Sequence, residues 1–350
     1  MSRLQPPSTV PRISVLVNNY NYGRYLQDAI DSAAAQLGEE DEIIVVDDGS
    51  SDGSSAVLDG LVSRPQVQVH RQRNAGQLGA VCAGLALARG DWVALLDSDD
   101  LYCDGYLARL REYVRLHPRT GWFFSRPVVL DQSDGGRIAQ GSFAAALYYP
   151  EGPVGPCRLA ASLFCDYVGS STSGLVLRGD LASELYALLH DYGGVYRGEG
   201  ARGEGPELSG YREALRQLPA DAVVVQLAAV LGYEAYSIEA PGFFYRMHAN
   251  NAYASLSPVR RYQARLHQLR VLRRFTRNVV SDRRPTLDEL VREIRCRTFP
   301  VRRRRRLMLA AKYAIGSLKA QAPLAVRLLS SPIIFTRCLF SRSAGPDEKH

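Results

Sequence analysis

The sequence predicts an α/β protein with a mostly parallel sheet, helices on both faces of that sheet, and a basic helical extension at the C-terminus. Over the first 100 residues, apolar runs alternate with segments of helical periodicity, a pattern typical of strands buried on both faces. The charges then divide the chain. Residues 1–250 carry 20 basic and 30 acidic side chains (net −10), whereas residues 251–350 carry 23 and 6 (net +17).

The predicted elements follow one another as a βαβαβαβ series. The strands are expected at 13–17, 42–46, 67–70 and 92–96, and the helices at 24–36, 54–62 and 78–88. Beyond them, 101–117 is predicted as a helix, 121–130 as a strand and 131–157 as loop-rich. Ligands of open parallel sheets bind beyond the carboxyl ends of the strands. The polar motifs of this chain occur at those ends.

Composition excludes several classes of protein. With 46% hydrophobic and 23% charged residues, the chain is globular rather than disordered, collagenous or a coiled coil. Six cysteines without a CxxC spacing argue against a disulfide scaffold or a zinc ribbon and favour a reduced, cytoplasmic setting. We expect neither a secretory signal nor a membrane-spanning helix, because no apolar segment of the required length occurs.

One glycine pattern has the spacing of a dinucleotide-binding motif but lacks its context. Gly198, Gly200 and Gly203 match GxGxxG, in a glycine-rich stretch from 193 to 210. No predicted strand precedes it and no amphipathic helix opens from it, so we do not expect a dinucleotide there. We expect an inserted loop instead.

The second strand ends in VVDDGSSDGS, which contains Asp47 and Asp48. Carboxylates at this place can accept hydrogen bonds from the imide N–H of a base or from ribose hydroxyls. They can equally cap the helix that follows. The residues alone leave both interpretations open.

The fourth strand ends in ALLDSDDLY, which places Asp97, Asp99 and Asp100 within four residues. In an extended segment Asp97 and Asp99 point to the same side, and like charges so close repel unless a cation lies between them. Mg²⁺ or Mn²⁺, bound by carboxylates together with substrate phosphates, is the predicted occupant. The alternative is a solvated acidic turn. A calcium loop of the EF-hand kind would need a different spacing.

Between these two motifs lies a glycine-bearing loop that opens a helix and contains Arg73, Asn74 and Gly76. Free N–H groups at a helix start bind anions, and an arginine adds a charge-assisted contact to a phosphate. A tightly packed helix start is the alternative.

Taken together, the motifs resemble the family 2 glycosyltransferases. The similarity covers about 11–252, and it rests on the segments at 17–26, 45–54, 74–84, 89–100, 172–181, 220–228 and 245–251, in that order. It implies the Rossmann-like GT-A fold, inversion at the anomeric carbon and a nucleotide-sugar donor, a UDP-sugar by default. It also implies a donor-binding half at 11–125 and an acceptor-binding and catalytic half at 126–254, between a proline-containing lead-in at 1–10 and the basic extension at 255–350.

The resemblance also implies roles for individual residues. On the donor side these are Asn19, Tyr20, Asp47, Asp48, Arg73, Asn74, Gly76, Asp97 and Ser98. Asp97 and Asp99 correspond to the metal-binding DxD pair, with His248 near the metal or diphosphate. Asp221 stands where the family has its catalytic base, with Asp166 as a second candidate, and Thr172, Ser173 and Gly174 fall in the acceptor region. The sequence departs from the family at Asn18-Asn19-Tyr20-Asn21, where Pro-Thr-Tyr-Asn is usual, and at Cys82, where Asn is usual.

The basic extension contains Arg302–Arg306 and then apolar residues at helical spacing interrupted by Lys and Arg. This pattern predicts an interfacial helix on an anionic membrane surface, which would make the protein peripheral to the cytoplasmic face of a membrane. Packing of the extension on its own domain, or on a second copy in a homo-oligomer, is the alternative. Nucleic acid is not expected, because the catalytic part is acidic and no nucleic-acid-binding fold is recognisable.

The predicted function is therefore inverting transfer of a sugar to a hydroxyl of a saccharide or lipid-linked acceptor. Two other functions fit the sequence less well. A carbohydrate-binding or scaffold protein with a degenerate site would lack the carboxylates, and all of them are present. A sugar nucleotidyltransferase would need a glycine-rich basic phosphate loop near the N-terminus, which 18–25 does not supply.

Overall fold

The computed structural model describes residues 10–131, 137–139, 149–155, 169–191 and 218–248, together with 251, 267 and 271–272. Four sequence predictions lie largely or wholly outside these residues: the lead-in, the base candidate Asp166, the glycine-rich stretch 193–210 and most of the extension.

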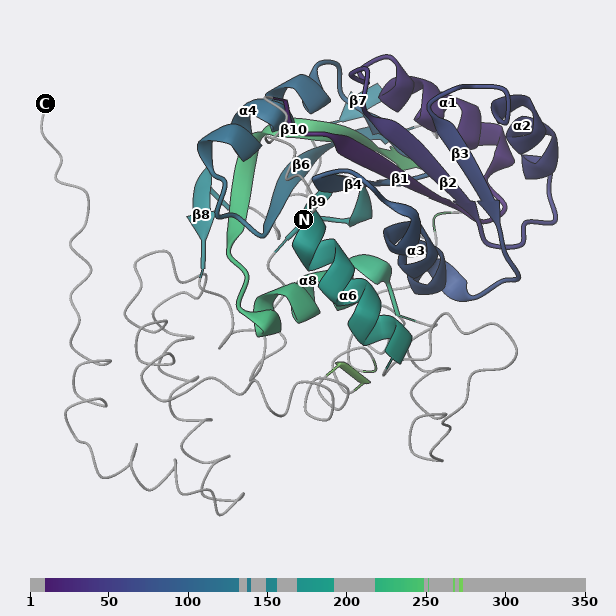
Figure 1. Ribbon diagram of the computed structural model, residues 1–350. Coiled ribbons are helices and arrows are strands. Elements are labelled where there is room, and N and C mark those ends of the chain that lie inside the picture. The colour runs from purple at the N-terminus through teal and green to yellow at the C-terminus, as the bar shows by residue number, and fades with distance from the viewer. Residues whose placement is uncertain are drawn as a thin grey trace, which may run out of the picture.

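Ten strands of the described part form one sheet (Figure 1). They are β1 (Ile13–Asn19), β2 (Glu42–Asp47), β3 (Val67–Arg71), β4 (Trp92–Asp97), β5 (Leu101–Tyr102), β6 (Trp122–Asp131), β7 (Arg137–Ala139), β8 (Gly152–Val154), β9 (Leu175–Arg178) and β10 (Ala235–Met247). The spatial order is β3-β2-β1-β4-β9-β6-β10-β5, with β7 paired to β6 and β8 to β10. The long ladders β3-β2-β1-β4 and β6-β10 are parallel. The antiparallel ladders are short.

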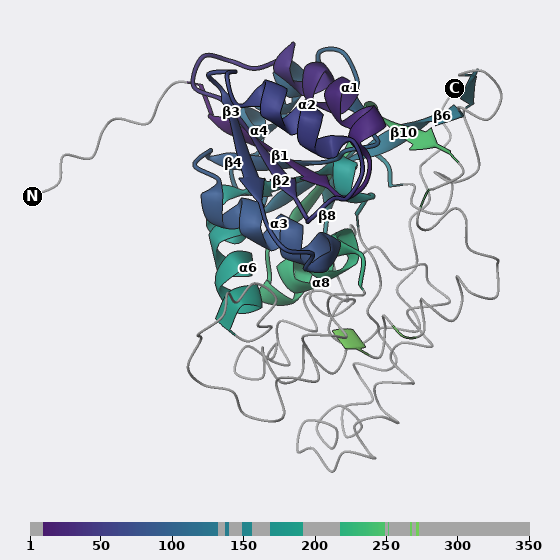
Figure 2. The same cartoon turned by 90° about the vertical axis from the view of Figure 1, so that its right-hand side faces the viewer.

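Helices cover both faces of the sheet, and Figures 1 and 2 show the three layers from two sides. On one face lie α1 (Gly23–Ala34), α2 (Ser54–Leu61) and α4 (Tyr106–Leu116); on the other lie α3 (Gly76–Leu87), α6 (Gly179–Asp191) and α8 (Ala220–Leu231). Successive strand residues point to opposite faces. Val15 and Val17 accordingly belong to the core under α1, whereas Leu16 belongs to the core under α3. This confirms the predicted fold class.

The central strands read as continuous apolar runs because both of their faces are buried. In β2 the four residues Ile43 to Val46 are all fully buried. Helix α3 approaches β1 so closely that a Cβ at Gly84 would meet the Leu16 side chain at 2.3 Å. A glycine in this helix interior is therefore required by packing.

Two predicted segments differ in detail from the structure. Residues 101–117 were expected to be one helix, but Leu101–Tyr102 pairs with β10 as β5, and α4 begins only at Tyr106. Gly105 precedes the helix with φ +70°, a left-handed conformation that a helix cannot include. The loop-rich stretch 131–157 contains the short strands β7 and β8.

One short piece of the basic extension is described. Leu272 is buried in the core beneath α3, α6 and α8, and Val271 packs against that core. At this point the extension lies on its own domain, as one of the two alternatives predicted. Among the described residues, no helix has the length and apolar character needed to cross a membrane.

Candidate active site

The topology brings the polar motifs to one edge of the sheet. Because β1, β2 and β4 are parallel, their carboxyl ends lie side by side, with Asn19 opposite Asp47 and Asn18 opposite Asp97. Strand β9 runs antiparallel to β4, so the 3₁₀ turn that precedes it, η2 (Thr172–Gly174), lies at this same edge. The carboxyl end of β10 also reaches this edge, since β10 runs parallel to β6, which like β4 is antiparallel to β9.

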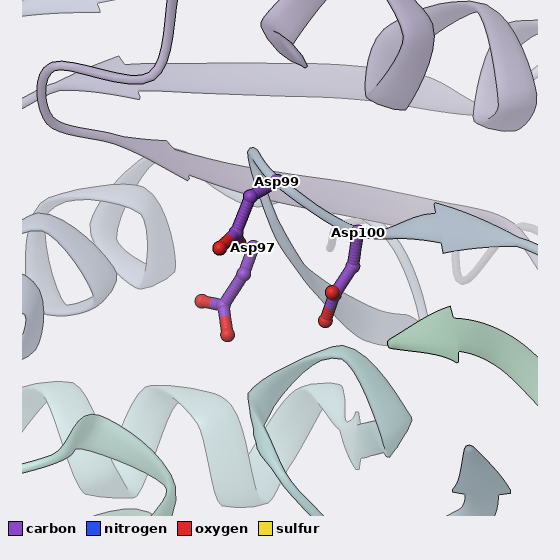
Figure 3. A group of neighbouring side chains, drawn as sticks. All are labelled: Asp97, Asp99 and Asp100. Carbon is purple, nitrogen blue, oxygen red and sulfur yellow. The ribbon is translucent and has the colours of Figure 1, made fainter. Parts of the chain in front are cut away.

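Three carboxylates gather where β4 ends. Asp97, Asp99 and Asp100 each offer an oxygen, and these oxygens lie within 4.8 Å of one another. Figure 3 shows the three side chains leaving the turn toward the same side. Burial, followed by the charge of Asp99, raises the pKa of Asp97 to about 7, and the same two causes raise that of Asp100 well above its usual value. The three side chains offer only oxygen ligands and concentrate negative charge in a small volume. Both properties suit a hard divalent cation.

Asp97 is held in place from three directions. Its Oδ1 accepts hydrogen bonds from Asn18 Nδ2 and from Gln77 Nε2, both at 2.9 Å. Its backbone N–H donates to Ser173 Oγ at 3.0 Å. No hydrogen bond from the described residues reaches Oδ2. The side chain is therefore oriented through one oxygen, and the other is available for a cation.

Asp99 meets the carboxyl end of β10. Its Oδ2 lies 3.1 Å from His248 Nε2 and accepts a hydrogen bond from Asn251 Nδ2 at 3.3 Å. The imidazole of His248 packs against the rings of Tyr22 and Tyr25, with centroids at 5.4 and 4.7 Å. The predicted metal residues Asp97, Asp99 and His248 thus lie together, although nearly 150 residues separate the histidine from the aspartates.

Asp100 is 1% exposed and is hydrogen-bonded to residues of η2 and β10. Its Oδ2 accepts a hydrogen bond from Ser173 Oγ at 2.6 Å, and its Oδ1 accepts one from the backbone N–H of Arg246 at 3.0 Å. Ser173 thus contacts both Asp97 and Asp100. Thr172, Ser173 and Gly174 are all buried, so the structure places them beneath the carboxylates, and their role in binding an acceptor stays a prediction.

The carboxylates after β2 are satisfied by protein donors. Asp47 Oδ1 accepts hydrogen bonds from Asn19 Nδ2 at 2.8 Å and from Ser50 Oγ at 2.6 Å. Asp48 Oδ1 accepts bonds from Gln72 Nε2 and from the backbone N–H of Ala75, both at 2.7 Å. Its Oδ2 accepts one from the backbone N–H of Gly76 at 2.8 Å, so Asp48 caps α3 rather than the next helix in the chain.

The remaining donor-side residues line this edge. Tyr20 is 48% exposed beside the Asp47 turn, whereas Ser98 is buried between Asp97 and Asp99. Arg73 and Asn74 are exposed, and Asn74 Nδ2 donates to the Asp48 carbonyl at 3.1 Å. Asp48 thus accepts hydrogen bonds from the N–H groups at the start of α3, where an anion site was predicted, and phosphate binding by this loop stays a prediction.

Asp221 lies in the first turn of α8, and its Oδ1 accepts a hydrogen bond from the Ala222 N–H at 2.7 Å. Its charge contributes to the raised pKa of Asp97, so the two carboxylates belong to one electrostatic site. Sequence patterns did not single out Gln77, Arg246 and Asn251 as site residues. All three stood inside segments that carry the family resemblance, Gln77 in 74–84 and Arg246 and Asn251 in 245–251, but no sequence period links them to the distant residues they contact.

Comparison with known proteins places this edge in a family. The model of the family described as Glycosyl transferase family 2 matches residues 14–159. The chain is 45% identical over 103 residues to the glycosyltransferase alr2836 of Nostoc sp., covering 29% of this chain and 32% of that protein. It is 39% identical over 112 residues to the succinoglycan biosynthesis protein ExoO of Rhizobium meliloti, covering 31% and 32%. The chain thus matches about a third of the length of these relatives.

The crystal structure of S. aureus TarS 1-349 in complex with UDP-GlcNAc superposes with a TM-score of 0.50 at 16% identity, covering 95% of this chain and 93% of that one. At that identity the likeness concerns the fold, which is of the GT-A type. Residues 14–159, which carry β1, β2, β4 and the three aspartates, are thus the part of this chain that is similar to glycosyl transferase family 2.

Proposed function

We propose that this protein is an inverting glycosyltransferase that moves a sugar from a nucleoside-diphosphate sugar, a UDP-sugar by default, to a hydroxyl of a saccharide or lipid-linked acceptor. The observation that carries the proposal is the cluster of Asp97, Asp99 and Asp100 at the carboxyl edge of the sheet, with the charge of Asp221 acting on it. The name of one relative, a succinoglycan biosynthesis protein, agrees with transfer of a sugar to a saccharide.

The residues fit a divalent cation. The donor set is entirely oxygen and it is crowded, and the pKa values of Asp97 and Asp100 are raised, first by burial and then by the charge of Asp99. Mg²⁺ or Mn²⁺ would be held by Asp97 and Asp99, with His248 beside Asp99. When bound, such an ion neutralises charge that develops on the departing diphosphate.

The protein's own groups supply the rest of the reaction. An acceptor hydroxyl is a weak nucleophile at neutral pH, so a carboxylate must take its proton as the new bond forms. We assign that proton to Asp221. A base on one side of the sugar and a leaving group held on the other make one in-line displacement, which inverts the anomeric carbon. Tyr20 and Asp47 are assigned to the nucleoside.

The proposal is tested with purified protein, Mn²⁺ and a panel of nucleotide-sugars, by measuring nucleotide release. One donor should be hydrolysed slowly, and EDTA or Asp99→Asn should reduce the rate at least about 100-fold. Asp221→Asn should reduce transfer to an acceptor by 10²- to 10⁴-fold, roughly the contribution of a general base, while the donor still binds. Asp59→Asn, on the exposed surface of α2, is the control.

Activity that survives both EDTA and Asp99→Asn would rule out the metal assignment. Loss of donor binding in Asp221→Asn would mean that the base lies elsewhere. Failure to bind or hydrolyse any donor, with the folded protein binding a saccharide, would favour the carbohydrate-binding alternative.

A further inference from the structure

Gln77 joins two parts of the site that come from distant segments of the chain. Its Nε2 donates to Asp97 Oδ1 at 2.9 Å and to Thr172 Oγ1 at 3.3 Å. Its Oε1 accepts a hydrogen bond from the backbone N–H of Ala220 at 3.1 Å. Both ends of this one amide are therefore used, one on the carboxylate cluster and one on α8.

The contact with Ala220 has a clear physical function. Ala220 is the first residue of α8, and the first N–H groups of a helix have no partner within the helix. The N-cap position is Pro219, which provides no side-chain hydrogen bond to the helix. Gln77 therefore acts as a cap supplied from another element, α3.

At the other end of the Gln77 amide, the Nε2 group contacts Asp97. Among the described residues, Gln77 and Asn18 donate to Asp97 Oδ1, so they orient this carboxylate. Asp221 follows Ala220 directly and acts electrostatically on Asp97. A shift of α8 at its start would thus change the separation of the two carboxylates.

We propose that Gln77 is a positioning residue that couples Asp97 to the start of α8 and thereby sets where Asp221 lies relative to the donor. The roles of Asp97 and Asp221 rest on the proposed function; the physical coupling of Gln77 to α8 does not. A misplacement of about 1 Å of a reacting group can cost roughly 100-fold in rate. The side chain thus contributes to turnover more than to donor binding.

The coupling is tested first by hydrogen exchange of the peptide covering α8, in Gln77→Ala, Gln77→Glu and the natural protein. Without metal, exchange at the start of α8 should be faster in Gln77→Ala by about fivefold or more, since loss of a cap costs about 1 kcal/mol. Gln77→Glu keeps an acceptor for the Ala220 N–H but puts a carboxyl oxygen against Asp97 Oδ1, so its exchange should stay close to that of the natural protein at a pH low enough for the two carboxyls to share a proton. Added Mn²⁺ and UDP should slow exchange in the natural protein and not in Gln77→Ala.

Gln66→Ala is the matched control. Gln66 is also a partly buried glutamine whose Nε2 donates to several acceptors, the carbonyls of Gly38, Glu39 and Asp41, but it precedes β3 at the opposite edge of the sheet. Its loss should lower the unfolding temperature and leave the exchange of α8 unchanged, with or without Mn²⁺ and UDP.

Kinetics separate positioning from a merely structural role. In Gln77→Ala, kcat for transfer should fall about 100-fold while KM for the donor changes less than about threefold. Natural exchange rates at α8 in Gln77→Ala, or a change confined to KM, would overturn the proposal. If the natural protein turns over no nucleotide-sugar, the proposed function fails, whereas the metal-free exchange experiment still decides whether Gln77 holds α8.

Discussion

Two groups of aspartates stand at the same edge of the same sheet, one after β2 and one after β4, and their surroundings differ. After β2, the carboxylates meet N–H and O–H donors: Asp48 accepts hydrogen bonds from Gln72 and from the N–H groups at the start of α3, and Asp52 accepts bonds from the backbone N–H groups of Gly23 and Ser54 and from Ser54 Oγ. After β4, the partly buried Asp97 and the buried Asp100 lie beside another carboxylate, and their pKa values are raised.

This difference indicates which carboxylates need a bound cation to offset their charge. Although partial burial acts against it, hydrogen bonding from Ser54 and Gly23 lowers the pKa of Asp52, so its charge is stabilised by the fold alone. The charge of Asp97 is destabilised by the fold, first through burial and then through Asp99. Identical side chains thus serve two purposes. Asp48 and Asp52, after β2, cap helices, whereas the aspartates after β4 repel one another, and a divalent cation would relieve this repulsion.

The largest effect that tests this comparison is the pH dependence of stability without metal. The folded-state pKa of Asp97, about 7, lies above its usual value of 3.8. The stability that this carboxyl contributes is therefore complete below about pH 4 and is lost as the pH rises through 7. Between pH 5 and 8, in EDTA, the free energy of unfolding should fall by roughly 2–3 kcal/mol more in the natural protein than in Asp97→Asn.

Chemical unfolding at several pH values measures this difference. Mn²⁺ should restore the stability of the natural protein at pH 8 and have little effect on Asp97→Asn. If the free energy of unfolding changed equally with pH in the two proteins, the carboxylates after β4 would not repel one another appreciably. They would then not differ from those after β2.

A somewhat smaller effect is expected after β2. Asp48→Asn replaces one carboxylate oxygen by an NH₂ group, which cannot accept a hydrogen bond from the N–H groups of α3 or from Gln72. Loss of hydrogen bonds to a buried charged group should cost about 2 kcal/mol of unfolding free energy, measured by urea titration. Asp91→Asn is the control, because Asp91 is half-exposed and pairs with Arg12 on the surface. If Asp48→Asn were as stable as the control, Asp48 would have no capping role.

Sequence patterns predicted the fold well and the supports of the site poorly. The strands through β4 were placed within about two residues, because buried parallel strands are continuous apolar runs. The aspartates were found because charged residues directly after such runs are conspicuous. Gln77, Asn18 and Ser173 hold Asp97 through contacts that span 20, 79 and 76 residues, and spacing in the sequence cannot reveal these.

The same limit explains the ambiguity at Asp48. The motif offered two interpretations, contact with a nucleoside or capping of the following helix. The structure places both of its oxygens on the start of α3, a helix that begins 28 residues later and not the next one in the chain. Such a cap arises from the side-by-side arrangement of β1, β2 and the α3 loop, and local helix-start rules do not include it.

The smallest effect concerns Asp52, which links two helix starts. The beginnings of α1 and α2 touch so closely that a Cβ at Gly23 would meet the Ser54 nitrogen at 2.5 Å. Two positive helix ends converge there, and the carboxylate of Asp52 accepts one N–H from each at 2.9 Å. Asp52→Ala should therefore cost about 1 kcal/mol, as for the loss of a helix cap.

Urea unfolding and Mn²⁺ titration of the same samples test this last point. Asp59→Ala is the matched control, since the exposed pair of Asp59 with Arg71 should contribute less than about 0.5 kcal/mol. Mn²⁺ affinity should stay within twofold in both variants, because neither carboxylate belongs to the cluster after β4. A fall in Mn²⁺ affinity confined to Asp52→Ala would mean that the turn after β2 takes part in holding the metal, and the two groups of aspartates would then form a single site.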